Sequence, residues 1–133
     1  MSLESNGQKD PKTTVSSHKD LIVWQKSMRL AKDIYSLTAS FPSDEKFGLI
    51  SQIRRSAVSI PSNIAEGRSR NTRKDFIQFL HIALGSLAEL ETQLELSKNL
   101  SFGKKPYYNQ VESLLGEVRK MLIKMISSLK ALS

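Results

Sequence analysis

The sequence predicts an all-α protein that folds as an up-down-up-down four-helix bundle. Apolar residues recur at three- and four-residue spacing along four long segments, which is the period of a helix with one buried face. The few glycines and prolines, six and four in 133 residues, fall mostly between those segments. Short connections place successive long helices side by side and antiparallel. These observations together favour a bundle.

Composition limits the classes of function. The sequence has no cysteine, which excludes disulfides, thiolate metal sites and a cysteine nucleophile. No apolar run approaches the ~20 residues that span a bilayer, and the N-terminus lacks the apolar core of a signal peptide. We therefore expect a cytoplasmic protein without a membrane partner. The formal net charge of +7 favours polyanionic partners, but it fits a merely basic protein equally well.

Residues 1–18 are polar and carry too few apolar side chains to bury a core, so we expect a disordered leader there. The bundle domain is predicted over residues 19–133. Its first helix should begin between Lys19 and Trp24 and run to about Ala39. The following Phe41-Pro42 ends it, because a residue before proline is pushed out of the helical region.

The second helix is predicted to start at Ser43 as its N-cap and to end at Gly67 in a left-handed conformation. It carries two seams side by side, one apolar and one polar. The apolar seam is Leu49, Ile53, Ala57, Ile60 and Ile64. The polar seam is Gln52, Ser56, Ser59, Asn63 and Glu66. We expect the polar seam to face the third helix, within one chain or between two chains.

The third helix should open at Thr72, whose spacing to Asp75 is that of a capping box, and reach about Asn99. Gly85 and Ser86 are small enough to let another backbone approach closely. Pro106 suits the first turn of the fourth helix, which has the strictest apolar period in the chain. The buried stripe of the third helix is predicted to be Phe76, Leu80, Ala83, Leu87, Leu90 and Leu94.

The sequence contains little evidence for a catalytic or metal-binding site. A di-iron bundle needs Glu-x-x-His pairs, but the two histidines, His18 and His81, do not follow a glutamate by three residues. Glu66 and Glu89 could act as acid and base if brought together, although hydrogen bonding to Asn63, Ser86 or an arginine explains them better. We therefore predict no catalytic residue, no metal and no cofactor.

Charge is segregated along the chain. Residues 43–74 carry seven basic and three acidic side chains, residues 75–100 one and four, and residues 101–133 six and two. Basic residues crowd the turn between the second and third helices, where backbone donors would add to an anion site. The candidate nucleic-acid-binding residues are Arg55, Arg68, Arg70, Arg73 and Lys74. Alternatively, the arginines form intersubunit salt bridges with Glu89, Glu91 or Glu95.

Aromatic residues that could stack on bases are scarce near this turn. Tyr107 and Tyr108, beside Lys104 and Lys105, form the one platform that the sequence suggests, and a core role for one of these tyrosines is the stronger expectation.

Several motifs resemble the bacterial four-helix bundle proteins encoded in intervening sequences of 23S ribosomal RNA genes. They are Ser59-Ile-Pro-Ser-Asn-Ile-Ala-Glu-Gly67, Arg70, Phe79-Leu80, Ala83-x-Gly85-Ser86-x-x-Glu89-x-x-Thr92 and the leading Asp20-Leu-x-Val-Trp24-Gln. The resemblance covers about Lys19 to Leu132. It implies a ring-like homopentamer and kinship with the accessory protein of diversity-generating retroelements, a basic pentamer that associates with a reverse transcriptase and nucleic acid.

The resemblance also implies that certain residues matter for packing or assembly, and it defines no activity. These residues are Ser59, Asn63, Glu66, Gly67, Arg70, Gly85, Ser86 and Glu89. Our leading hypothesis is a non-enzymatic oligomeric bundle that contacts RNA or DNA, as accessory to a ribonucleoprotein. The rival is a protein scaffold whose arginines are used in assembly, and a hydrolase using Glu66 and Glu89 is a remote third.

Overall fold

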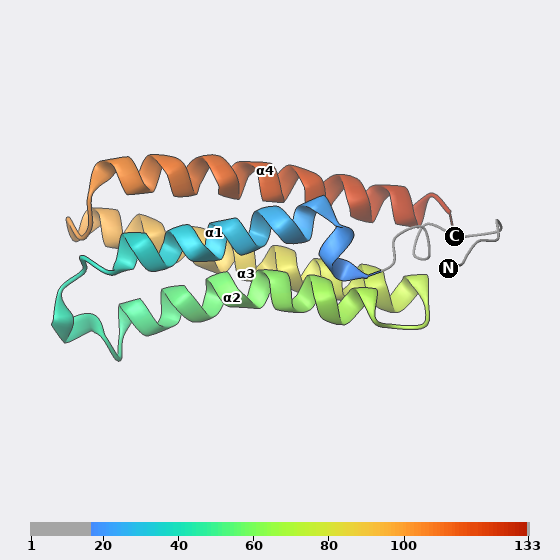
Figure 1. The fold of residues 1–133 in the computed structure, drawn as a ribbon, viewed down its shortest axis with the longest axis horizontal. Coiled ribbons are helices and arrows are strands. Elements are labelled where there is room, and N and C mark those ends of the chain that lie inside the picture. Colours follow the sequence, from blue (N-terminus) through green and yellow to red (C-terminus); the bar gives the residue numbers. More distant parts are fainter. Residues whose placement is uncertain (1–16, 133) are drawn as a thin grey trace.

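The computed structural model describes residues 17–132, which form four long helices lying side by side along one axis (Figure 1). The helices are α1 (Ile22–Thr38), α2 (Leu49–Arg68), α3 (Arg73–Asn99) and α4 (Lys105–Lys130). Successive helices run antiparallel, and the fold is the expected all-α four-helix bundle. Within the described residues, no helix is both long enough and apolar enough to cross a membrane.

The N-terminal end of α1 is preceded by a short 3₁₀ helix, η2 (His18–Asp20). The Ser17 side chain caps it by accepting from the Lys19 N–H at 3.1 Å. The His18 ring contacts Trp24 edge-on, with centroids 5.1 Å apart. The predicted leader, residues 1–18, lies outside the described residues except for its last two positions. Those two positions are structured, because Ser17 caps the turn that His18 begins.

The start of α2 differs from the prediction. Ser43 does not cap α2 but begins a separate 3₁₀ helix, η3 (Ser43–Glu45), and α2 itself begins at Leu49. The first turn is capped from a distance, because the Glu45 carboxylate accepts from the Leu49 N–H at 3.1 Å. Gly48 lies between them, and a Cβ there would lie 3.0 Å from the Glu45 Oε1. The missing side chain thus makes room for the cap.

The role predicted for Gly67 was wrong. Gly67 does not end α2 in the left-handed region but lies inside the helix, and α2 continues to Arg68. At Gly67, α2 packs directly against α3. A Cβ on Gly67 would lie 2.7 Å from the Cβ of Phe79 and 3.0 Å from the Cδ1 of Phe76. Real Cβ atoms do not approach that closely. Glycine is required here because two helix backbones meet, rather than because the chain turns.

The core runs the length of the bundle and contains the stripes that the sequence predicts. The five residues of the apolar seam of α2 and the six of the α3 stripe are all buried.

Thr72 caps α3, accepting from the Asp75 N–H at 3.1 Å, and Pro106 lies in the first turn of α4. The α2–α3 pair packs most extensively, and α1 lies against both α2 and α4. At one end, the loop between α3 and α4 covers the core, with Gly103 (φ 78°) against Phe41.

Candidate nucleic-acid interface

The polar seam of α2 meets α3 at its middle, through Ser59, whereas the ends of the seam, Gln52 and Glu66, are exposed. The Ser59 and Ser86 hydroxyls lie 2.7 Å apart across the two helices. Asn63 donates from Nδ2 to the Ser59 carbonyl at 2.8 Å and to the Ser59 hydroxyl at 3.0 Å. Because Ser59 accepts from Asn63, its own proton is free to go to Ser86. This network ties two consecutive turns of α2 to the middle of α3.

The two carboxylates proposed as an acid–base pair take no part in this network. Glu66 is exposed and binds Arg70, with Arg70 Nη2 2.9 Å from Glu66 Oε2. Glu89 is also exposed, on α3. Among residues 17–132, no group of three or more histidines or carboxylates could hold a metal ion. The hydrogen-bonded arrangement of Ser59, Asn63 and Ser86 joins α2 to α3.

The small residues on α3 are used unequally. Ser86 is buried and contacts α2, as expected. Gly85 is exposed, and a Cβ built there would meet nothing within 4 Å. The prediction that Gly85 admits another backbone is therefore wrong for the packing within this chain.

The basic turn, which comprises Arg68, Arg70, Arg73 and Lys74, joins α2 to α3 at the end of the bundle where α1 begins and α4 ends (Figure 1). Arg70 is held between partners: besides the Glu66 ion pair, its guanidinium lies 4.7 Å from the centroid of the Phe79 ring. Arg73 Nη1 lies 3.5 Å from the Leu132 carbonyl, beyond the C-terminus of α4, where a cation is favoured. Lys74 is exposed.

The structure separates Arg55 from the other four candidates. Arg55 is exposed on α2, thirteen positions before Arg68, which corresponds to about 20 Å along a helix at ~1.5 Å per residue. The five predicted nucleic-acid-binding residues therefore lie at two separate sites on the surface rather than at one. The basic turn occupies one end of the bundle, and Arg55 belongs to the half of α2 nearer the opposite end.

The carboxylates proposed as intersubunit partners are largely engaged within the chain. Glu91 pairs with Arg119 of α4, and Glu95 lies 3.9 Å from Lys98, which also binds Glu112 at 2.6 Å. A further pair joins Lys26 of α1 to Glu117 of α4, and this hydrogen bond lowers the pKa of Glu117. The Glu95–Lys98 pair lies within α3, and the other pairs cross-link neighbouring helices of one chain. Of the three proposed carboxylates, Glu89 is the one without an ion pair to another described residue.

Of the two tyrosines beside the α3–α4 loop, Tyr108 is the core residue. It is 5% exposed and donates its hydroxyl to the Phe102 carbonyl at 2.8 Å, and burial raises the pKa of the phenol. Tyr107 is 41% exposed. One of the two tyrosines was expected in the core, and that residue is Tyr108. The expected base-stacking platform therefore consists of the Tyr107 ring alone.

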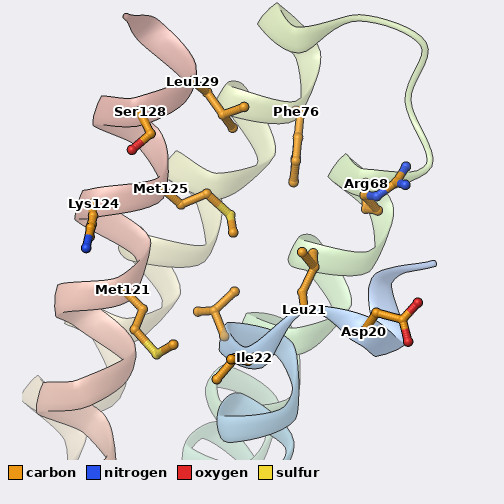
Figure 2. Close-up of a pocket in the computed structure, with 11 residues that line it drawn as sticks. Asp20, Leu21, Ile22, Arg68, Phe76, Met121, Lys124, Met125, Ser128 and Leu129 are labelled. Atoms are coloured by element: carbon orange, nitrogen blue, oxygen red, sulfur yellow. The ribbon is translucent and has the colours of Figure 1, made fainter. Parts of the chain in front are cut away.

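A cavity of about 470 Å³ lies beside the basic turn, where the ends of all four helices meet. Figure 2 shows Met121 and Met125 reaching from α4 towards Leu21, with Phe76 above them. Lys124 and Asp20 point away from the space between the helices. The cavity wall is therefore mainly apolar, and this cavity does not suit phosphate groups.

Sequence reasoning missed an exposed aromatic residue in the α1–α2 connection. Phe47 is 89% exposed and follows Lys46, whose Nζ is 5.5 Å from the ring centroid. The sequence interpretation placed residue 47 inside a helix starting at Ser43, where a phenylalanine is expected to pack. The pairing of Lys46 and Phe47 next to Gly48, with Arg54 and Arg55 about two turns further on, was the signal that could have revealed it.

Fold and surface thus define a small antiparallel helical bundle with basic residues at both ends. A family model described as 23S rRNA-intervening sequence protein matches residues 19–124. The chain belongs to this family. A search of curated proteins gave no match.

A similar solved structure is the crystal structure of a protein of unknown function from the S23 ribosomal protein family of Bacteroides thetaiotaomicron VPI-5482. It is 34% identical, with a TM-score of 0.73 over 80% of this chain and 96% of that one.

Proposed function

We propose that this protein is a non-enzymatic, oligomeric helical bundle that associates with RNA, as an accessory component of a ribonucleoprotein. The observation that carries the proposal is the segregation of charge: the segments 43–74 and 101–133 each have a net charge of +4, whereas most of the acidic residues between them lie on α3. Cations at fixed positions on a rigid bundle bind phosphates and release counterions. A reverse transcriptase is a protein partner that fits the family resemblance, and DNA is an alternative to RNA.

Within the basic turn, Lys74 and Arg70 are the side chains that a phosphate would meet first, since both are exposed. The Arg70 guanidinium is already fixed by Glu66 and by the Phe79 ring, so it loses little freedom when it binds. Arg68 and Arg73 are half-buried, so they are less accessible to a phosphate than Lys74 and Arg70.

A salt titration of RNA binding tests the proposal. A fluorescent RNA should bind at low salt and lose about 10³-fold in affinity between roughly 50 and 200 mM salt if about six phosphates are contacted. Lys74→Ala should reduce the slope of log affinity against log salt by about one. Lys32→Ala, an exposed lysine on α1, provides the matched control. Absence of binding to RNA and DNA at low salt would exclude the proposal.

The second candidate is a protein scaffold that does not bind nucleic acid. The observation that favours it is exposed apolar surface on α2 and α3, where Val58 is 42% and Ile82 45% exposed. Charge reversal at Arg70 separates the two functions. In the scaffold, Arg70→Glu changes the mass measured by light scattering, because the arginine serves assembly. In the RNA-associated protein, the same change weakens RNA binding and leaves the mass unaltered.

A further inference from the structure

A shallow groove of about 500 Å³ crosses the α1–α2 edge of the bundle, near the η3 end. It lies towards the opposite end of α2 from the basic turn (Figure 1). Two aromatic and three basic residues line it, and its wall contains no carboxylate among the described residues. The aromatic residues are Tyr35 and Phe47, and the basic residues are Lys46, Arg54 and Arg55.

Phe47 is the most exposed large apolar residue of the described chain, at 89%. Its side chain therefore contributes almost nothing to the core, although burial of a phenylalanine ring is ordinarily favourable. Lys46 Nζ lies over one face of the ring, 5.5 Å from its centroid, and the 89% exposure of Phe47 leaves the other face open to solvent. An open aromatic face beside a cation is the element from which base-stacking platforms are built.

A second flat surface in the groove is pre-organised. The Arg54 guanidinium lies 4.3 Å from the centroid of the Tyr35 ring, and its Nε donates to the Thr38 hydroxyl at 2.9 Å. Thr38 is buried, so the guanidinium is tied to a rigid part of α1. Nucleic-acid bases stack on guanidinium planes as well as on aromatic rings.

Resting on the RNA association proposed above, we infer that this groove is a binding site for single-stranded nucleic acid. A base stacks on Phe47, a neighbouring base contacts the Arg54–Tyr35 surface, and Lys46 and Arg55 bind the phosphates between them. Three cations without an opposing carboxylate match a polyanion. Single strands are favoured over duplexes because only unpaired bases can leave their own stack to lie on protein side chains.

The test uses the full chain and a labelled adenosine oligoribonucleotide of about twelve nucleotides, within the roughly 4–16 that such surfaces accommodate. Phe47→Ala should weaken binding by about tenfold or more, and Phe47→Trp should restore it, because an indole ring also stacks. Leu96→Ala removes an exposed apolar side chain of α3 outside the groove and should leave binding unchanged. Circular dichroism should show unaltered melting of Phe47→Ala, since the ring is not part of the core.

An abasic oligomer of the same length separates stacking from charge. It keeps the phosphates, so the wild-type protein and Phe47→Ala should bind it equally, whereas Arg55→Ala should bind it more weakly. A duplex that contains the same sequence should bind the wild-type protein and Phe47→Ala with equal affinity.

Three results would overturn the inference. If the wild type binds the single strand and Phe47→Ala binds it equally well, the groove is not the site, although the protein remains RNA-associated. If Phe47→Ala lowers the mass in light scattering, the ring contacts a second copy of the chain. If the wild type binds neither single strand nor duplex at low salt, the proposed function itself fails, and the groove loses its ligand with it.

Discussion

At the scale of single residues, the two glycines on facing helices have opposite roles. Gly67 lies where α2 is packed tightly against Phe76 and Phe79 of α3, so its hydrogen is the largest substituent that fits. Gly85 has open space around it and contributes only backbone freedom to the middle of α3. The motif in which both occur does not distinguish them, because the difference depends on which side of each helix the partner lies.

Gly67→Ala should destabilise the protein by about 1–3 kcal/mol, because the new methyl group collides with the Cβ of Phe79 and forces the helices apart. Gly85→Ala should instead stabilise the folded chain by up to about 1 kcal/mol, since alanine is the better helix former and meets no neighbour. Urea unfolding followed by circular dichroism measures both. Equal effects of the two substitutions would contradict the close approach at Gly67.

At the scale of secondary-structure elements, the four helices, the Thr72 cap of α3, the place of Pro106 in the first turn of α4 and the buried stripes follow from the sequence. Periodicity depends on local spacing, which a single sequence contains in full. The start of α2 does not follow, because Ser43, Asp44 and Glu45 have the composition of a helix N-terminus but form a separate 3₁₀ turn. Gly48 and the reach of the Glu45 side chain place the real start at Leu49, and such a cap depends on a rotamer.

The contact between α2 and α3 should show coupling through Ser59 and Ser86. Each substitution to alanine removes the 2.7 Å hydrogen bond, so the double variant should lose less stability than the sum of the single variants. The expected coupling free energy is about 0.5–1.5 kcal/mol, measured by denaturant unfolding of the four proteins of the cycle. A matched pair, Ser59 with the exposed Ser113 of α4, should give additive effects.

At the scale of the whole molecule, the candidate site was less predictable than the fold. The basic residues at the α2–α3 turn lie close together in the sequence, so their grouping could be predicted. Arg55 was assigned to them by charge alone, and the length of α2 separates it. The groove at the other end combines Tyr35 of α1 with Phe47 and Arg54, and this combination depends on how α1 packs against α2. A single sequence contains no information on that packing.

The proposed homopentamer can be tested by the mass of the protein in solution. In solution, the light-scattering mass should be about five times the 15.0 kDa of one chain if the homopentamer forms. Ile82→Glu should lower this mass, because a charge would replace exposed apolar surface on the α2–α3 face. Ile123→Glu makes the same change on α4, where 52% of the side chain is exposed, and should leave the mass unchanged. A monomeric wild type would exclude the pentamer.

The edge-on contact between His18 and Trp24 has an optical consequence. Trp24 is the one tryptophan in the sequence, and it lies at the end of the bundle where α1 begins, packed against the core. Its emission spectrum should therefore report the docking of the η2 turn without any label. An RNA that occupies the groove near Phe47 should leave that emission nearly constant, whereas one bound at the basic turn should alter it. The chain thus contains a natural fluorophore that tells which end of the bundle is occupied.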